Sequence, residues 1–254
     1  MQIQLIRNAT LRLDYAQHTF VIDPYLAAKH TLPSYTGASP NPLVDLPCPP
    51  QDVIAGIDMV VISHLHSDHF DPAAQGMLPK DMTILCQPQD GPELEARGFR
   101  DVVPVADSVR WKGITITRTA GQHGTGQVLE MMGNVSGFIF QAKNEPTVYW
   151  AGDTIWCKAV ADVIAQTRPN VIITHSGGAV WGDKVPIIMN AAQTIAVCRA
   201  APDSIVVAVH MEALDHTTVS REALREHAEA NGIAPEKLLI PADGEKLTFP
   251  GMQP

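Results

Sequence analysis

The 254-residue sequence has few cysteines and no long apolar run. Its four cysteines form no Cys-x-x-Cys pair, so we expect free thiols rather than a disulfide framework or a cysteine metal site. No stretch of about 18 apolar residues is present, so we expect no membrane-spanning helix. The first residues show no charged segment followed by an apolar one, so we expect no secretory signal and a cytoplasmic location.

Basic side chains are also scarce. Eighteen Lys and Arg residues stand against 27 Asp and Glu residues, and the formal net charge is −9 with histidine neutral. This balance argues against a general nucleic-acid or anionic-membrane binder, so a small-molecule substrate is expected instead. Hydrophobic residues make up 45% of the chain and charged residues 18%, which excludes a disordered protein. We find no linker or repeat and predict one domain over residues 1–254, with homo-oligomer formation left open.

The apolar pattern changes along the chain. Short alternating or continuous apolar runs predict strands at residues 2–7, 10–15, 18–23, 58–63, 82–86, 102–105, 114–119, 135–141 and 147–150. The second half predicts helices at 158–167, 190–200 and 220–231, with strands at 171–174, 205–209, 238–240 and 246–249. Strands followed by alternating strands and helices indicate two sheets with helices outside them.

A proline-rich loop occupies residues 24–50. Seven prolines stand at positions 24, 33, 40, 42, 47, 49 and 50, and the segment has little apolar periodicity. A connection of this length inside a compact domain is often functional. We therefore expect a lid over a site, with a passive surface loop as the alternative.

Histidine, by contrast, is concentrated. The segment His64-Leu65-His66-Ser67-Asp68-His69 directly follows the apolar run at residues 60–62. In an extended chain, residues two apart point the same way, so His64 and His66 can bind one ion. If the chain then turns, Asp68 and His69 can face a second ion. Imidazole nitrogens with a carboxylate oxygen suit zinc or another first-row metal, so the segment predicts a metal site rather than isolated structural histidines.

Further ligands must come from elsewhere in the chain, because one segment cannot complete such a site. His123, Asp153 and His210 each follow a predicted strand directly. Open sheets place their sites at the carboxyl ends of strands. Each residue alone would be read as a cap or a structural side chain, but together with the histidine segment we expect them to be ligands.

Several neighbours of these positions have two possible roles. His175 and His216 can contact the substrate or support the ligands, or can be ordinary hydrogen-bonded loop histidines. Trp156 and Trp181 flank the site loops, where packing is the expected role and a pocket wall the alternative. The pair Gly177-Gly178 allows backbone N–H groups to approach an anionic ligand, or forms a tight turn.

These motifs, in this order and over nearly the whole chain, resemble the metallo-β-lactamase superfamily. The resemblance implies an α+β fold, a four-layer αββα sandwich with a dinuclear metal site at one edge of the sheets. It implies His64, His66 and His123 as ligands of the first ion, Asp68, His69 and His210 as ligands of the second, and Asp153 as the bridging carboxylate.

Details of the motifs point to a branch of the superfamily. Hydroxyacylglutathione hydrolases and many acyl-homoserine lactonases carry Thr-Pro-Gly-His at the third motif, where this chain has Ala-Gly-Gln-His ending at His123. That run, Ala-Gly-Asp-Thr around Asp153, and Val-Ile-Asp-Pro at residues 21–24 are more similar to the ascorbate-6-phosphate lactonase and N-acylphosphatidylethanolamine phospholipase D relatives.

The implied chemistry is metal-dependent hydrolysis. Two divalent ions, expected to be Zn²⁺ with Mn²⁺ or Fe²⁺ as alternatives, can share a water and lower its pKa to about 7. Asp68 and Asp153 are the expected catalytic carboxylates, and Asp68 can also move a proton. We expect an ester or lactone of a small, anionic molecule as substrate. Alternatives are a phosphodiester on the same two ions, a mononuclear iron oxygenase, and a non-catalytic metal-dependent binding protein.

Overall fold

Two seven-stranded sheets form the centre of the protein, whose computed structural model describes residues 1–251. The first sheet runs in the order β16 (Lys246–Thr248), β1 (Gln2–Arg7), β2 (Thr10–Tyr15), β3 (His18–Ile22), β4 (Met59–Ile62), β5 (Thr83–Cys86), β6 (Asp101–Pro104). Its strands are antiparallel from β16 to β3 and parallel from β3 to β6.

The second sheet is mixed in the same way. Its order is β15 (Leu238–Leu239), β14 (Ile205–Val209), β11 (Val171–His175), β10 (Val148–Trp150), β9 (Ser136–Gln141), β8 (Ile114–Ala120), β7 (Ser108–Trp111). Strands β10, β11, β14 and β15 are parallel, and β7 to β10 are antiparallel. A small separate hairpin consists of β12 (Val180–Trp181) and β13 (Val185–Pro186).

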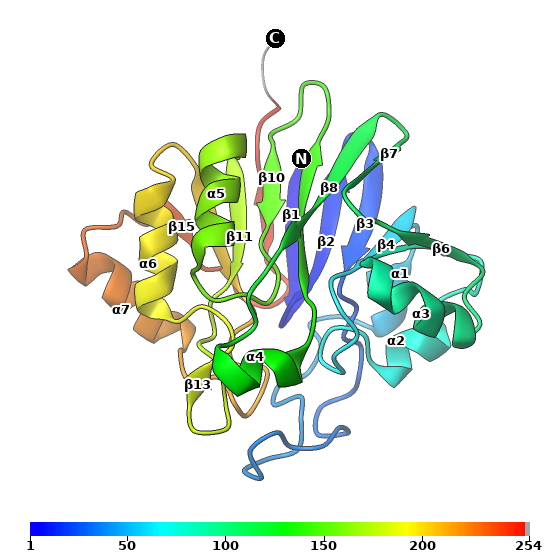
Figure 1. The fold of residues 1–254 in the computed structure, drawn as a ribbon, viewed down its shortest axis with the longest axis horizontal. Coiled ribbons are helices and arrows are strands. Elements are labelled where there is room, and N and C mark those ends of the chain that lie inside the picture. The colour runs from blue at the N-terminus through cyan, green and yellow to red at the C-terminus, as the bar shows by residue number, and fades with distance from the viewer. Residues whose placement is uncertain (252–254) are drawn as a thin grey trace.

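Helices cover the outer faces of both sheets (Figure 1). The second sheet is covered by α5 (Lys158–Thr167), α6 (Ala191–Ala200) and α7 (Arg221–Ala230), and the first by α1 (Pro50–Ile54), α2 (Pro72–Met77), the 3₁₀ turn η1 (Pro88–Asp90) and α3 (Gly91–Ala96). Helix α4 (Gly126–Met132) crosses one end of the sheets. The predicted αββα sandwich is confirmed.

Strand β9 shows how the sequence builds these layers. Phe138 and Phe140 are buried in the core between the sheets, whereas Ile139 packs in the layer between the second sheet and its helices. Successive side chains of a strand point to opposite faces, so one continuous apolar run supplies both layers. Burying each aromatic ring contributes about 1.5–3 kcal/mol, which stabilises the packing of the two sheets.

The long elements match their predicted ranges to within one or two residues. Helix α6 begins where the sequence predicts, because Asn190 and Gln193 form a reciprocal capping box. The short helices α1 to α4 and strand β7 were not predicted, since four to seven residues carry too little periodicity. The four cysteines, all within residues 1–251, are free as expected.

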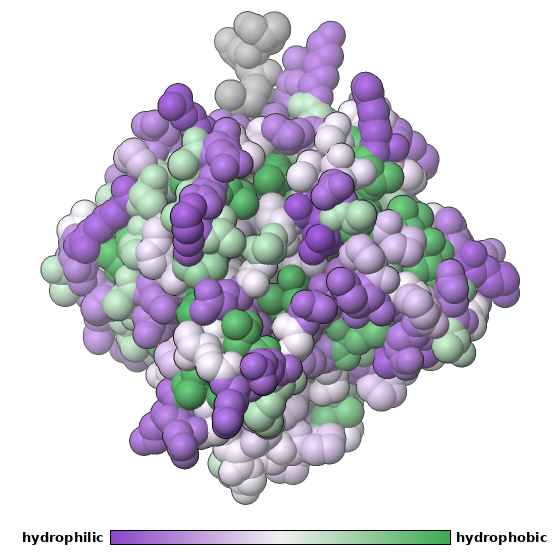
Figure 2. Space-filling model, viewed as in Figure 1, coloured by the Kyte–Doolittle hydropathy of each residue, from purple (hydrophilic) through white to green (hydrophobic). Residues whose placement is uncertain are grey.

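The surface is mostly hydrophilic on the face that Figure 2 presents, with apolar residues showing between the polar ones. Met131 on α4 is the large hydrophobic side chain most exposed within residues 1–251, at 66%. In the same part of the chain, no helix combines the length and the hydrophobicity needed to cross a bilayer.

The proline-rich loop is tied to the first sheet by a buried arginine. Arg7 donates to the carbonyls of Val44 (2.9 Å), Tyr25 (3.0 Å) and Ala27 (2.8 Å). Its guanidinium also lies 4.8 Å from the centre of the Tyr25 ring. These contacts fix both ends of the loop against β1.

The carboxylate of Asp215 holds several residues in the middle of the loop. Asp215 accepts hydrogen bonds from Ser34, Tyr35, Thr36 and Asn41. Burial raises the pKa of Asp215, but these donors outweigh it and hold the pKa well below its ordinary value. The carboxylate therefore stabilises the loop above the unfolded-state pKa of about 3.9, and this contribution is lost as the pH falls toward the folded-state pKa.

Replacing Asp215 with asparagine should loosen the loop. The amide nitrogen cannot accept the hydrogen bonds of Ser34 and Thr36, so amide hydrogen exchange in residues 31–41 should rise by about tenfold. Asp203→Asn, at an exposed position just before β14 begins, serves as the control and should leave exchange in the loop unchanged. Equal protection in both variants would show that Asp215 does not hold the loop.

Candidate metal centre

The structure brings the predicted ligands together at one end of the sandwich. His64 follows β4, His123 follows β8, Asp153 follows β10, His175 ends β11 and His210 follows β14. All five residues are less than 4% exposed. Residues distant in sequence thus converge because parallel neighbours end at the same edge of a sheet and the two sheets face each other.

Three histidines form the first group of metal-ligating atoms. Donor atoms of His64, His66 and His123 all lie within 4.8 Å of one another. Nε2 of His64 and Nδ1 of His66 are 2.8 Å apart, as expected for two side chains two residues apart on an extended segment. Together they can occupy one side of a tetrahedral ion.

A second group lies beside the first. Donor atoms of His69, Asp153, His175 and His210 lie within 4.8 Å of one another. The Nε2 atoms of His69 and His210 are 3.3 Å apart, and Oδ2 of Asp68 lies 3.5 Å and 3.3 Å from them. Asp68 therefore lies beside this group, and its role as a ligand of the second ion stays a prediction.

Asp153 lies between the two groups. Its Oδ2 atom is 3.2 Å from Nε2 of His69 in the second group. The same oxygen is 3.5 Å from Nε2 of His123 and 3.9 Å from Nε2 of His64 in the first. A carboxylate reaching both sets of nitrogens has the geometry of a bridging ligand.

Hydrogen bonds behind the rings orient the ligand nitrogens. Nδ1 of His123 donates to the carbonyl of Ile187 at 2.7 Å, which leaves Nε2 free to bind. Nδ1 of His69 lies 2.6 Å from Oδ2 of Asp23, and Asp23 also accepts from the N–H and hydroxyl of Ser63. Such carboxylate–histidine and carbonyl–histidine pairs are typical of protein metal sites.

The charges of this buried cluster balance around a cation. Burial lowers the pKa of His123 to about 4, so its ring is neutral and its lone pair is available. Burial opposes ionisation of Asp153, but the His69 and His210 rings and the hydrogen bond from His175 hold its pKa well below the ordinary value. Burial also lowers the pKa of His69, yet Asp153, Asp68 and Asp23 raise it well above normal. The ionised carboxylates thus stabilise a positive charge between the imidazole rings. The set of nitrogen and oxygen ligands fits divalent ions.

Glycine allows the His210 loop to pack this closely. A Cβ at Gly177 would lie 2.1 Å from the carbonyl oxygen of His210, and that histidine itself has φ +60°. Gly178, with φ +60°, would clash with Val219 and Thr218 if it carried a side chain. The glycine pair therefore serves close backbone packing that positions His210.

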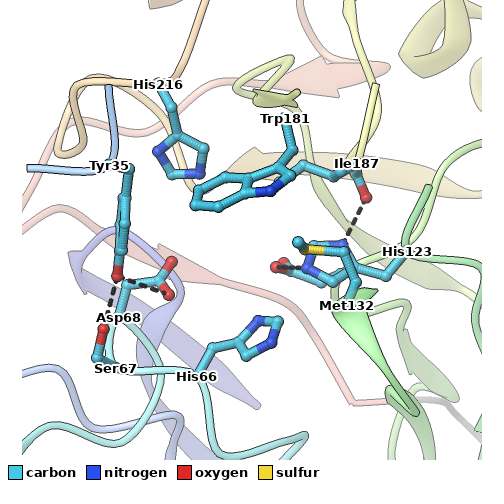
Figure 3. A pocket seen from close by; sticks show the side chains of 10 residues that line it. Tyr35, His66, Ser67, Asp68, His123, Met132, Trp181, Ile187 and His216 are labelled. Carbon is cyan, nitrogen blue, oxygen red and sulfur yellow. Dashed lines mark hydrogen bonds and ion pairs between the residues drawn. The ribbon is translucent and has the colours of Figure 1, made fainter. Parts of the chain in front are cut away.

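A pocket of about 210 Å³ opens above the cluster (Figure 3). It is lined by Tyr35, His66, Ser67, Asp68, His123, Met132, Asp153, Trp181, Ile187 and His216. The Tyr35 hydroxyl points at Ser67 (2.7 Å to Oγ) and Asp68 (3.4 Å to Oδ1). Burial and Asp68 raise the pKa of Tyr35, so its hydroxyl stays protonated.

The structure distinguishes the histidines and tryptophans for which the sequence left two possible roles. His216 lines the pocket and packs edge-on against Tyr35, with ring centres 4.8 Å apart. Trp181 also lines the pocket, whereas Trp156 packs in the helix layer. His175 lies beneath the pocket against Asp153, at 2.5 Å from Nδ1 to Oδ1.

Sequence reasoning missed several residues around the site. Asp23 stood in the Val-Ile-Asp-Pro run, but its contact with His69 needs the pairing of β3 and β4. Met132 and Ile187 have no chemical signal in sequence, and Tyr35 was hidden in the proline-rich loop. That loop does reach the pocket through Tyr35, while its movement as a lid stays a prediction.

Comparisons with known proteins identify the family of this chain. The model of the β-lactamase superfamily domain matches residues 18–211. The UPF0173 protein YddR of Bacillus subtilis is 38% identical over 98% of this chain and 100% of its own length.

Two solved structures are similarly close. An isothiocyanate hydrolase from Delia radicum gut bacteria is 38% identical, with a TM-score of 0.92 over 98% of this chain and 99% of that one. A possible metal-dependent hydrolase from Veillonella parvula is 36% identical, with a TM-score of 0.94 over the same shares. From the matching domain, the full-length relatives and the His/Asp cluster, it follows that this chain belongs to the metallo-β-lactamase superfamily, as a metal-dependent hydrolase.

Proposed function

We propose that this chain hydrolyses a small, uncharged electrophile, in the first place an isothiocyanate, R–N=C=S, using two divalent ions such as Zn²⁺. The observation that carries this proposal is the pocket above His66 and Asp68, which is small and largely apolar. The 38% identity to an isothiocyanate hydrolase over 98% of the chain supports the same substrate class.

The pocket walls favour an apolar group R. Tyr35, Met132, Trp181 and Ile187 line the pocket beside the candidate ligands, and neither Lys nor Arg is among the described residues that line it. Phosphate groups are usually bound by such cations or by clustered N–H donors. The anionic ester or lactone that the sequence predicts, and the alternative phosphodiester, would therefore find no Lys or Arg side chain in this pocket.

The reaction needs an activated water and proton transfers. Bound divalent ions lower the pKa of water to about 7 and polarise the substrate. The water oxygen bonds to the central carbon of R–N=C=S, both water protons reach nitrogen, and the carbon–nitrogen bond breaks. The products are a primary amine, R–NH₂, and carbonyl sulfide.

Two side chains at the pocket, Asp68 and Tyr35, lie where they can assist these proton transfers. Oδ1 of Asp68 faces the pocket, so it can accept the proton of water and pass it to nitrogen. The Tyr35 hydroxyl, within reach of the same oxygen, can donate a hydrogen bond to the sulfur or nitrogen as charge develops there.

The test is a substrate panel with the metal-loaded protein. Benzyl and allyl isothiocyanates, an aryl ester, a lactone and a bis-aryl phosphodiester are compared by kcat/KM, with amine and carbonyl sulfide measured as products. We expect the isothiocyanates to be preferred by at least tenfold. Preference for the ester, lactone or phosphodiester would replace the proposed substrate class, and no turnover of any compound would favour a binding protein.

Tyr35→Phe tests the hydrogen-bond donor at the pocket floor. The ring and its packing against His216 are kept while the hydroxyl is lost, so kcat should fall by about 10- to 100-fold with little change in KM. Tyr149→Phe is the control, because it removes a hydroxyl that is buried between the second sheet and its helices, away from the pocket. An unchanged kcat in Tyr35→Phe would exclude a role for the hydroxyl in the reaction.

A further inference from the structure

His175 shares the second group of metal-ligating atoms, but both of its ring nitrogens have partners within the protein. Nε2 accepts a hydrogen bond from the indole N–H of Trp150 at 3.1 Å. Nδ1 lies 2.5 Å from Oδ1 of Asp153. His175 and Trp150 are fully buried, and Asp153 is 3% exposed, so water does not compete for these contacts.

The indole decides which nitrogen of His175 carries the proton. An indole N–H can only donate, so Nε2 must present its lone pair to Trp150. The proton of a neutral ring is then on Nδ1, where it is donated to Oδ1 of Asp153. With one nitrogen occupied by Trp150 and the other protonated, neither is free to bind an ion.

We propose that His175 is a positioning residue: locked by Trp150 as the Nδ1–H tautomer, it holds Oδ1 of Asp153 and thereby turns Oδ2 toward both groups of ligands. The distances agree, since Oδ2 is the oxygen that lies 3.2 Å from His69 and 3.5 Å from His123. The inference rests on the proposed pair of ions and is independent of the substrate.

The core supplies the rigidity of this arrangement. Trp150 lies on β10 and stacks on Phe138 of the neighbouring strand β9, with ring centres 6.3 Å apart and planes at 9°. Because Asp153 follows the same β10 strand after three residues, Trp150 sets both the tautomer of His175 and the start of the loop that carries the carboxylate. The metal centre is thus oriented from the interior of the sandwich.

Two substitutions of His175 separate its two hydrogen bonds. Asparagine places its amide nitrogen near the position of Nδ1, so His175→Asn keeps a donor for Asp153 and loses the acceptor for Trp150. Glutamine reaches the position of Nε2, so His175→Gln keeps an acceptor for Trp150 and leaves Asp153 without its donor. His227→Gln on the outer helix α7 is the matched control.

Metal content and chelator competition with Zn²⁺ give the readout. We expect His175→Gln to lose affinity for the second ion by about 10- to 100-fold, and His175→Asn to remain within about threefold of wild type. Wild-type affinity in His175→Gln would overturn the proposal. Equal losses in both variants would do so too, because they would indicate a merely structural role.

The tautomer is measured independently on the unaltered chain. ¹⁵N NMR of metal-free wild-type protein should show a protonated Nδ1 and an unprotonated Nε2 for His175, and Trp150→Phe should mix the two tautomers. A protonated Nε2 in the wild type would overturn the proposal that Trp150 fixes the tautomer of His175, even if a variant fails to fold. Since neither readout involves substrate, failure here is distinguishable from failure of the proposed hydrolysis, which the substrate panel tests.

Discussion

Replacing Asp153 with asparagine should lower kcat/KM by more than about 10³-fold and reduce the bound metal from two equivalents toward one. Its Oδ2 atom is the oxygen that lies between His69 and His123, and an amide is a far weaker ligand than a carboxylate. Loss of an ion removes several kcal/mol of transition-state stabilisation, which corresponds to this factor. Metal analysis and kinetics on the same preparation measure both effects.

The matched control is Asp162→Asn on α5. Asp162 is an exposed carboxylate that pairs with Lys158 four residues earlier, so its loss should leave metal content and activity near wild type. If Asp153→Asn retained two metal equivalents and full activity, a bridging role for Asp153 would be excluded.

Removing the metal with a chelator should abolish activity and lower the melting temperature. An ion held at 100 times its Kd stabilises the folded state by about 2.7 kcal/mol. For a domain of this size, 1 kcal/mol corresponds to about 2–4 °C, so each such ion should contribute about 5–11 °C. The change is measured by calorimetry before and after chelation, and both properties should return when Zn²⁺ is added.

Acid should act in the same direction as the chelator. Protons compete with the ions for the imidazole nitrogens, so lowering the pH should release metal and with it the stabilisation.

Metal analysis also distinguishes the alternatives left by the sequence. A single tightly bound iron, instead of two divalent ions, would contradict the dinuclear hydrolase and support an oxygenase.

The cluster of candidate ligands was predictable because its signal is local and chemical. Three histidines and an aspartate within His64–His69 have few uses besides a metal, and the strand before them places the segment at a sheet edge. The later candidates, His123, Asp153 and His210, also follow strands whose apolar runs are long enough to be recognised. Two sheets with outer helices followed from the same runs.

The pocket, by contrast, could not be predicted. Its walls come from the proline-rich loop, α4, the β12–β13 hairpin and the segment after β14, and short elements of this kind have no clear periodicity. Tyr35 reaches the site because Asp215, far away in sequence, holds the loop in place. The expectation of an anionic substrate rested on the charges of the site and took no account of this apolar lining.

The sequence alone thus determined which atoms are available to bind metal and at which strand ends they lie, because ligand chemistry and strand periodicity are local properties. Only the tertiary structure decided which oxygen of Asp153 faces the ligands, how Trp150 fixes the ring of His175, and what shape of substrate the pocket admits. These properties depend on contacts between residues distant in the chain, and such contacts exist only after the two sheets have packed against each other.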